Sequence, residues 1–233
     1  FGLTSTTQHF FTSKFEQSVL SSHSIMNCCI IDNPFPVRLN NDGRFILAKL
    51  ILNTPRLRLV AANLAMYQAE LHDRRQLAEM LQAEIPGDWP PPLNDADSMN
   101  YFIDYVADHP DAAGWTMWYF ILRSREGERD LLIGNGGFKG LPGEDGSAEI
   151  GYSVMETHHG RGYAPEAVAA LLAWAFSHNG VRRISAETYP HLRPSIRVLE
   201  KNGFRYLGPT ADAPVIRFEI TREEYMKRMK DKG

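Results

Sequence analysis

The feature that most constrains this chain is a strand-like run, a glycine loop and a helix-like run in immediate succession over residues 148–177. Residues 148–154 alternate between apolar and small or polar side chains, which is typical of a strand. The final dozen residues are rich in Ala and Leu, and we expect Pro165 at the first helical position with Glu166 in the first turn. The sequence therefore predicts a strand that leads through a loop into a helix N-terminus.

This arrangement is suited to binding a phosphate group. The first-turn N–H groups of a helix have no intrahelical partner, and the helix dipole favours an anion beside them. Gly160 and Gly162 lie in the loop, where a missing Cβ lets a ligand approach the backbone. The alternative is an ordinary strand-to-helix turn without a ligand, and this segment taken alone leaves both open.

Composition narrows the possible classes of protein. The chain has 233 residues, 43% of them hydrophobic and 23% charged, enough to bury one full core with an appendage. A net charge of −3 gives no global reason to expect nucleic acid or a membrane as a partner, and no run of 18 apolar residues is present. Cys28 and Cys29 are adjacent, so they cannot build a disulfide framework or a zinc site. We expect a cytoplasmic protein without a secretory signal.

The order of the expected elements predicts one mixed α/β domain over residues 53–225. Residues 1–50 form an N-terminal extension of uncertain structure, and residues 226–233 form a C-terminal tail. Strands are expected at 57–59, 115–122, 131–138, 148–154, 183–188, 204–207 and 215–220, and helices at 64–85, 95–108, from 165 to about 177, and at 193–202.

Three local motifs are set aside. Gly134-Asn135-Gly136-Gly137 lacks the helix that must follow a dinucleotide fingerprint. The adjacent pair His158-His159 has no further ligand at a metal-site spacing, so no metal is expected. Neither Ser195 nor the two cysteines have the surroundings of an activated nucleophile, which disfavours covalent catalysis.

Three runs of sequence, taken together, resemble a known family. They are Glu-Ile-Gly-Tyr at 149–152, His-Gly-Arg-Gly-Tyr-Ala-Pro-Glu-Ala at 159–167 and Ser-Ile-Arg-Val-Leu-Glu-Lys-Asn-Gly-Phe at 195–204. Their order and spacing resemble the GNAT superfamily of acetyl-CoA-dependent N-acetyltransferases, in the branch of the ribosomal-protein-alanine N-acetyltransferases, over about 53–225. The resemblance implies an α/β (α+β) fold with a mixed, mostly antiparallel central sheet flanked by helices. It also implies acetyl-CoA as the acyl donor, no metal, and an amine acceptor that is a small molecule or a peptide.

The resemblance assigns the cofactor-binding residues. The family's pyrophosphate loop (Arg or Gln, two residues, Gly, one residue, Gly or Ala) falls on His159, Gly162 and Ala164, and His159 departs from the usual residue. A second departure is Leu192, where the family usually has Asn. A splay or bulge near the end of the central strand is implied, to free backbone for the thioester. The implied cofactor-binding residues are Ser153, Val154, Met155, His159, Gly160, Arg161, Gly162, Tyr163, Ala164 and Lys201.

Acetyl transfer to an amine requires movement of protons. An amine with a pKa of about 10 must lose a proton, and the departing thiolate is expected to take one up. Glu149 and Glu187, on two neighbouring expected strands, are the candidate general bases, directly or through water. The alternative for each is a structural carboxylate. Ser195 is the candidate proton donor to the thiolate by analogy with the family, and its alternative role is a helix N-cap.

Charge is distributed unevenly along the chain. Residues 76–122 contain eight acidic and no basic side chains, whereas residues 158–205 contain seven basic and three acidic ones. A basic cofactor half and an acidic acceptor half suit a CoA thioester and a cationic amine, although a solvated acidic helix face gives the same pattern. Two further functions stay open: a non-catalytic CoA-binding module on the same fold, and a transferase for another acyl group.

Overall fold

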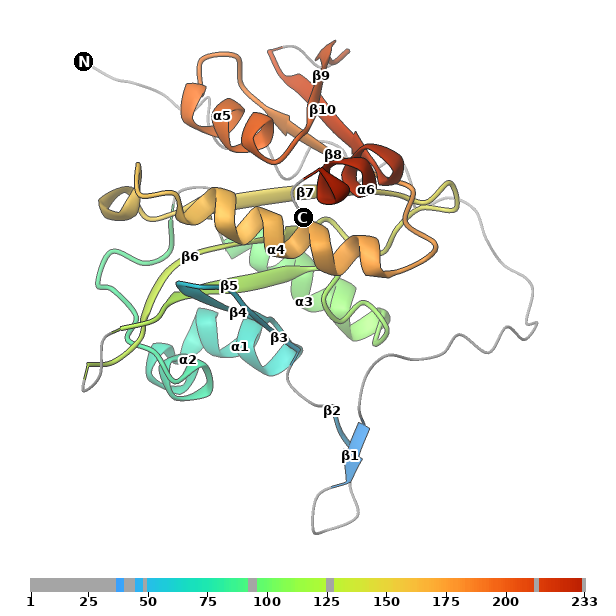
Figure 1. The fold of residues 1–233 in the computed structure, drawn as a ribbon. Helices are drawn as coiled ribbons and strands as arrows, with labels where there is room; N and C mark the ends of the chain where they lie inside the picture. The colour runs from blue at the N-terminus through green and yellow to red at the C-terminus, as the bar shows by residue number, and fades with distance from the viewer. Residues whose placement is uncertain are drawn as a thin grey trace, which may run out of the picture.

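The computed structural model of this protein describes residues 37–39, 45–47, 50–91, 96–124, 128–211 and 214–231. Within the predicted N-terminal extension, β1 (Val37–Leu39) and β2 (Phe45–Leu47) pair antiparallel as a small separate sheet (Figure 1). The remainder of that extension, apart from Leu50, lies outside the described residues.

The core of the fold is an eight-stranded sheet in the order β3-β4-β5-β6-β7-β8-β10-β9. All neighbouring strands pair antiparallel except β7 and β8, which are parallel, so the predicted mixed, mostly antiparallel sheet is confirmed. The strands are β3 (Ile51–Asn53), β4 (Leu57–Ala61), β5 (Met117–Leu122), β6 (Leu131–Phe138), β7 (Ser147–Val154), β8 (Arg183–Thr188), β9 (Arg205–Pro209) and β10 (Ile216–Thr221). The sheet begins with β3, which precedes the first strand expected from the sequence.

Helices cover both faces of this sheet (Figure 1). The helices α1 (Leu64–His72), α2 (Arg74–Leu81) and α3 (Ala96–Asp108) lie on one face. The long helix α4 (Tyr163–Ser177) lies on the other, together with α5 (Arg193–Lys201) and α6 (Arg222–Lys230). Flanking helices were predicted by the family resemblance and are confirmed.

The single helix expected over 64–85 is wrong, because two helices occupy this stretch. Asp73 ends α1 with its N–H on the Ala69 oxygen and begins α2 by accepting a hydrogen bond from the Gln76 N–H. Gln82 then ends α2 in the left-handed conformation, with φ of 52°. The apolar periodicity runs through both helices, so it could not reveal the break.

The start of α4 also differs from expectation. The N-cap is Gly162, and Pro165 is the third residue of the helix instead of the first. Proline is tolerated there because the first-turn N–H groups have no intrahelical acceptor.

The end of the chain contains one more helix than expected. The helix α6 runs through residue 225, where we placed the end of the domain, and continues to Lys230. Thr221 and Glu224 form a reciprocal capping box at its start, a local signal that is present in the sequence.

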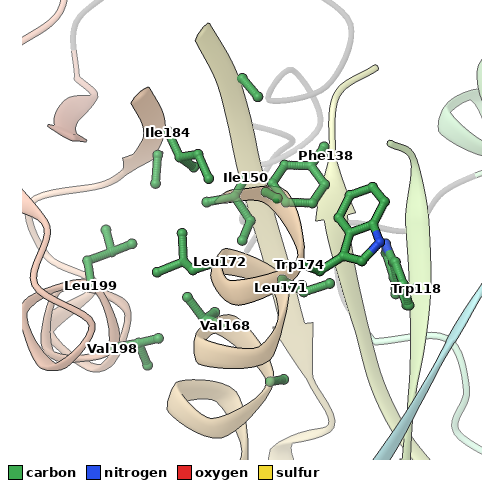
Figure 2. Close-up of a cluster of buried hydrophobic side chains, with 14 of the residues drawn as sticks. Trp118, Phe138, Ile150, Val168, Leu171, Leu172, Trp174, Ile184, Val198 and Leu199 are labelled. Atoms are coloured by element: carbon green, nitrogen blue, oxygen red, sulfur yellow. The ribbon is translucent and has the colours of Figure 1, made fainter. Parts of the chain in front are cut away.

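Two buried clusters lie on the two faces of the sheet. Along β5, Trp118 and Phe120 belong to the α4-side cluster, whereas Met117, Tyr119 and Ile121 belong to the cluster beside α1–α3. Figure 2 shows the α4-side cluster, in which side chains of α4 lie between the sheet and the α5 residues Val198 and Leu199 (the labelled α4 residues are Val168, Leu171, Leu172 and Trp174). Strand β7 follows the same alternation, with Ala148, Ile150 and Val154 facing α4. The odd-numbered residues of β7 therefore face the side of α1–α3.

Candidate active site

The parallel ladder between β7 and β8 is short. It comprises only the pairs Ser147↔Arg183, Ala148↔Ile184 and Glu149↔Ser185, whereas β7 stays paired with β6 as far as Val154↔Gly134. The two parallel strands therefore part after Glu149. Of the two distortions expected at the end of β7, the splay is present and the bulge is absent, because the β6–β7 register runs without a shift.

The splay leaves backbone groups of β7 without a strand on one side. The N–H of Lys139 donates to the Glu149 oxygen, and the N–H of Met155 donates to the Ile133 oxygen, so the odd-numbered residues of β7 bond to β6. By alternation, the N–H groups of Tyr152 and Val154 point toward β8, where the ladder has already ended. Two aligned amides at this edge are suited to polarising a carbonyl group.

The loop that follows β7 is built on two glycines in the left-handed conformation. Gly160 has φ of 74° and Gly162 has φ of 81°, angles that favour glycine over all other residues. A Cβ on Gly160 would meet nothing within 4 Å, so the requirement there is conformational. Gly162 caps α4 without any side-chain hydrogen bond to the first turn. The amides of the first turn therefore stay available to an anion.

The side chain of His159 contacts the end of β7, although the residue is exposed. Its Nε2 lies 2.7 Å from the backbone oxygen of Val154, so Nε2 carries the proton and donates it. The imidazole thus ties the loop to the end of β7. The cofactor-binding role of His159 stays a prediction.

Ser195 is the third residue of α5, and a β7 residue contacts it. The hydroxyl of Tyr152 lies 3.1 Å from both Oγ and the backbone oxygen of Ser195. Burial raises the pKa of Tyr152 to about 12, although the hydrogen bond to Ser195 opposes the rise, so Tyr152 keeps its proton at neutral pH. The N-cap of α5 is Leu192, which makes no side-chain cap, so the N-cap role considered for Ser195 is wrong. Tyr152 was not among the predicted site residues.

The two candidate bases lie on the same face of the sheet, on either side of the splay. Glu149 belongs to the last β7–β8 pair, and Glu187 lies two residues further along β8. Glu149 forms an ion pair with Lys139. Glu187 is only 6% exposed, and its Oε1 accepts hydrogen bonds from Arg217 Nη2 at 2.7 Å and Nε at 3.1 Å. Each carboxylate is thus held by a cation, a contact that sequence spacing did not predict.

Lys201 is the exposed last residue of α5, six residues after Ser195 and therefore about 9 Å further along the helix axis. Its backbone oxygen accepts a hydrogen bond from Arg228 of α6. The next residue, Asn202, donates from its side-chain nitrogen to the Pro165 oxygen at 3.2 Å, so the end of α5 lies beside the first turn of α4. A contact of Lys201 with the cofactor stays a prediction.

Asp88, one of the acidic residues within 76–122, acts on a residue beside the glycine loop. Burial and the charge of Arg161 lower the pKa of His158, and the charge of Asp88 opposes that lowering.

Trp89 is buried, and its Nε1 donates to Glu70 at 2.8 Å. Glu70 also accepts a 2.5 Å hydrogen bond from Tyr119, and burial raises the pKa of this carboxyl. Trp89 is therefore part of the core.

Three or more His, Cys, Asp or Glu side chains that could hold a metal ion do not come together in the described part of the chain. None of the described helices is both long enough and apolar enough to span a membrane.

These features define an acyltransferase fold, and comparison with known proteins identifies the family. Residues 56–205 match the acetyltransferase (GNAT) domain family. This chain belongs to that family. It is 30% identical over 155 residues to the uncharacterized N-acetyltransferase YjdG of Bacillus subtilis (strain 168), covering 66% of this chain and 89% of that protein. The resemblance inferred from the sequence is confirmed.

Solved structures agree on the fold. The complex of RimL, a ribosomal L7/L12 α-N-protein acetyltransferase, with coenzyme A superposes with a TM-score of 0.51 at 19% identity, covering 74% of this chain and 98% of that one. A variant of the spermidine/spermine N-acetyltransferase SpeG of Vibrio cholerae superposes with a TM-score of 0.51 at 16% identity, covering 74% and 99%.

Acetyl-CoA is the acyl donor of GNAT acetyltransferases, and the residues present fit it. The left-handed glycines and the uncapped first turn of α4 leave backbone donors at one end of this segment, and the splayed edge of β7 leaves them at the other. These two groups of donors suit a diphosphate and a thioester.

Proposed function

We propose that this acetyltransferase transfers the acetyl group of acetyl-CoA to a primary amine that is cationic in solution, on a small molecule or a protein N-terminus. One observation carries the proposal. The β7–β8 ladder ends at Glu149, and the same strand continues into the Gly160–Gly162 loop, so carbonyl-polarising amides and phosphate-binding amides belong to one segment. Acetyl-CoA supplies an activated thioester; the chain supplies alignment and proton transfer.

The backbone is assigned the binding roles. The amides from Gly160 to Ala164 hold the diphosphate, and the amides of Tyr152 and Val154 stabilise negative charge on the thioester oxygen. Because both sets belong to a strand end and the loop bonded to it through His159, little reorganisation is needed when the donor binds. Positioning of this kind is worth effective molarities of ~10⁵ M or more in well-aligned systems.

The side chains are assigned the proton transfers. The amine nitrogen attacks the carbonyl carbon, a C–N bond forms and the C–S bond breaks. The cationic amine first releases one proton to solvent and attacks as the neutral amine. Its second proton then goes to Glu149 or Glu187, directly or through water, while Ser195 gives a proton to the departing thiolate and regains one from water. The Tyr152 hydroxyl beside Ser195 orients this donor. No covalent intermediate on the enzyme is required.

The choice of a cationic amine rests on charge. Of the acidic residues within 76–122, Glu79 lies on α2 and Asp104 and Asp108 lie on α3, and both helices cover the face of the sheet toward which Glu149 and Glu187 point. RimL acts on a ribosomal protein and SpeG on polyamines, so proteins of this fold accept both kinds of amine. An acidic surface raises the local concentration of a cation of either kind. We expect neither nucleic acid nor membrane as a partner, and a cytoplasmic location stays a prediction.

A second function is favoured by specific observations. Both candidate bases are paired with cations, and His159 and Leu192 depart from the family pattern. A CoA-binding module without catalysis would tolerate all of these features.

Thiol release from acetyl-CoA, measured against polyamines, aminoglycosides, amino acids and N-terminal peptides, tests the proposal. Turnover with at least one amine supports it. Tight CoA binding by calorimetry without turnover across the panel would establish the non-catalytic module instead, and faster turnover with a longer acyl-CoA would redefine the donor. Absence of any affinity for CoA would overturn the proposal.

A further inference from the structure

Arg56, in the turn between β3 and β4, is fastened to the start of α4. Its Nε donates to Glu166 Oε2 at 2.6 Å and its backbone N–H donates to Glu166 Oε1 at 2.9 Å. Thr54 Oγ1 also donates to Glu166 Oε1, at 2.6 Å. The carboxylate of Glu166 therefore fixes Arg56 in one orientation.

The guanidinium of Arg56 lies directly against the glycine loop. Its Nη1 donates to the backbone oxygen of Arg161 at 2.8 Å, and its central carbon lies 4.6 Å from the centre of the Tyr163 ring. A Cβ on Gly162 would lie 3.4 Å from Nη2. Arg56 thus spans the loop segment whose amides we assign to the diphosphate, although it lies more than one hundred residues earlier in the chain.

One nitrogen of this guanidinium, Nη2, can donate a hydrogen bond to a ligand. In the portion of the chain that the structure describes, no hydrogen bond from Arg56 Nη2 to another residue is present, and the Arg56 side chain is 45% exposed. An arginine N–H beside a row of backbone amides is well suited to a phosphate oxygen, because guanidinium–phosphate hydrogen bonds are charge-assisted and directional.

The loop itself lacks such a cation at its first position. The family pattern has Arg or Gln there, and this chain has His159, whose Nε2 is bonded to the Val154 oxygen. We propose that Arg56 is a cofactor-binding residue, which donates from Nη2 to the diphosphate of CoA and replaces the cationic side chain that position 159 lacks. This inference rests on the proposed binding of CoA at the Gly160–Ala164 amides.

A purely structural role is the competing explanation. Arg56 could serve only to join the β3–β4 turn to α4 and so maintain the loop. The two roles predict different effects of replacing Arg56. If Arg56 binds the diphosphate, its replacement should not affect ligands that contain no phosphate. If Arg56 only shapes the loop, its replacement should affect every ligand that uses this site.

The test uses the full chain and calorimetric titration with CoA at two or more salt concentrations. We expect the R56Q variant to raise the Kd of CoA about 10- to 100-fold, the effect of losing one charge-assisted hydrogen bond. The salt dependence of binding should also become shallower, because one charge contact to phosphate is removed. The matched control is R75Q, which removes an arginine that is 87% exposed on α2, and its Kd should equal that of the wild type.

A second ligand separates binding from loop shape. Acetyl-pantetheine carries the thioester without the diphosphate, and the kcat/KM for this donor should be equal in R56Q and wild type. The R56K variant keeps the charge but lacks the fork of separate nitrogens with which Arg56 bonds to Glu166 and Arg161, so it should bind CoA with intermediate affinity, and it provides the test if R56Q does not fold.

The outcomes are distinguishable from those of the proposed function. If the wild type does not bind CoA, the cofactor site itself is wrong. If the wild type binds CoA and R56Q and R56K bind it equally well, only the role of Arg56 is wrong. Equal losses with CoA and acetyl-pantetheine would also overturn that role, in favour of a structural one.

Discussion

The hydroxyl oxygen of Tyr152 lies 3.1 Å from the Oγ of Ser195, which connects β7 to the first turn of α5 across the place where β7 and β8 part. The Ser195 backbone oxygen accepts from the same hydroxyl at the same distance. Because Tyr152 stays protonated at neutral pH, its hydroxyl can hold the Ser195 side chain in a defined position. If Ser195 protonates the thiolate, the rate of that proton transfer depends on this contact.

The first prediction concerns the Tyr152 hydroxyl. The Y152F variant keeps the buried ring and removes one neutral hydrogen bond, so kcat for acetyl transfer should fall about 3- to 10-fold. The Kd of CoA should change little, because the ring still packs beside the splay. Steady-state kinetics and calorimetry on the same preparations provide both values.

A double-mutant cycle identifies the partner through which Tyr152 acts. In an S195A background, Y152F should have no further effect on kcat, because the group that it positions is already absent. Y206F, which alters a tyrosine that is 57% exposed on β9, is the control and should behave as the wild type. Additive losses from Y152F and S195A would show that the contact does not matter for catalysis.

Local sequence patterns predicted much of this fold. The alternation over 148–154 identified β7, and the glycine loop with the Ala-rich run identified the start of α4 within a few residues. The break at Asp73 and the helix α6 were missed, although Asp73 and the Thr221/Glu224 pair are themselves capping signals. Apolar periodicity continues across Asp73, so periodicity alone predicts one helix where the capping residues mark two.

The contacts that shape the candidate site could not be predicted from local patterns, because they join distant segments. Tyr152 meets Ser195 from 43 residues away, and Arg56 meets Glu166 from 110 residues away. The splay between β7 and β8 is likewise a property of two strands separated by a long helix. The family resemblance supplied the splay and Ser195, whereas Tyr152 and Arg56 emerged only from the three-dimensional arrangement.

The second prediction concerns Gly162, whose φ of 81° and position beside Arg56 make it sensitive to any side chain. Valine there should raise the Kd of CoA about 100-fold or more, through the loss of about two charge-assisted hydrogen bonds from displaced amides. The left-handed conformation also costs a β-branched residue about 1–2 kcal/mol in folding.

A second glycine controls for this cost in folding. Gly208 has φ of 116° and open space around it on β9, so G208V imposes backbone strain away from the loop. Urea unfolding should show comparable destabilisation of the two variants, whereas calorimetry should show weak CoA binding only for G162V. An unchanged Kd in folded G162V would exclude the loop as the diphosphate site.

The third prediction separates the two candidate bases. Replacement of the true base by Gln should lower kcat/KM about 10²- to 10⁴-fold. Replacement of the other carboxylate should change kcat/KM much less. Comparing E149Q with E187Q by steady-state kinetics with the same amine therefore assigns the role, and a kcat/KM near that of the wild type in both variants would exclude both residues.

Each of these substitutions also removes an ion pair, that of Glu149 with Lys139 or that of Glu187 with Arg217. Thermal unfolding of each variant identifies any loss of activity that follows from a loss of structure. A variant that loses kcat/KM while its unfolding temperature stays near that of the wild type therefore identifies the base.

The final prediction concerns pH and Glu166. Partial burial raises the pKa of this carboxyl, but hydrogen bonds from Thr54 and Arg56 together with the charge of Arg56 outweigh burial and hold the pKa below its ordinary value. The unfolded chain therefore takes up a proton on this residue at a higher pH than the folded chain does. The resulting stabilisation is fully present above the unfolded pKa of about 4.3 and is lost as the pH falls through the folded pKa.

Urea unfolding of wild type and E166Q from pH 7 down to about pH 3.5 tests this expectation. The free energy of unfolding should be higher for the wild type at neutral pH, and the difference should shrink steadily below about pH 4.3. The control is E79Q on α2, where the pair with Arg75 spans 4.0 Å at an exposed surface, and its difference from the wild type should stay small throughout. A difference for E166Q that is constant across this range would show that the Arg56–Glu166 contact does not depend on the carboxylate charge, and the fixed orientation of Arg56 would then require another cause.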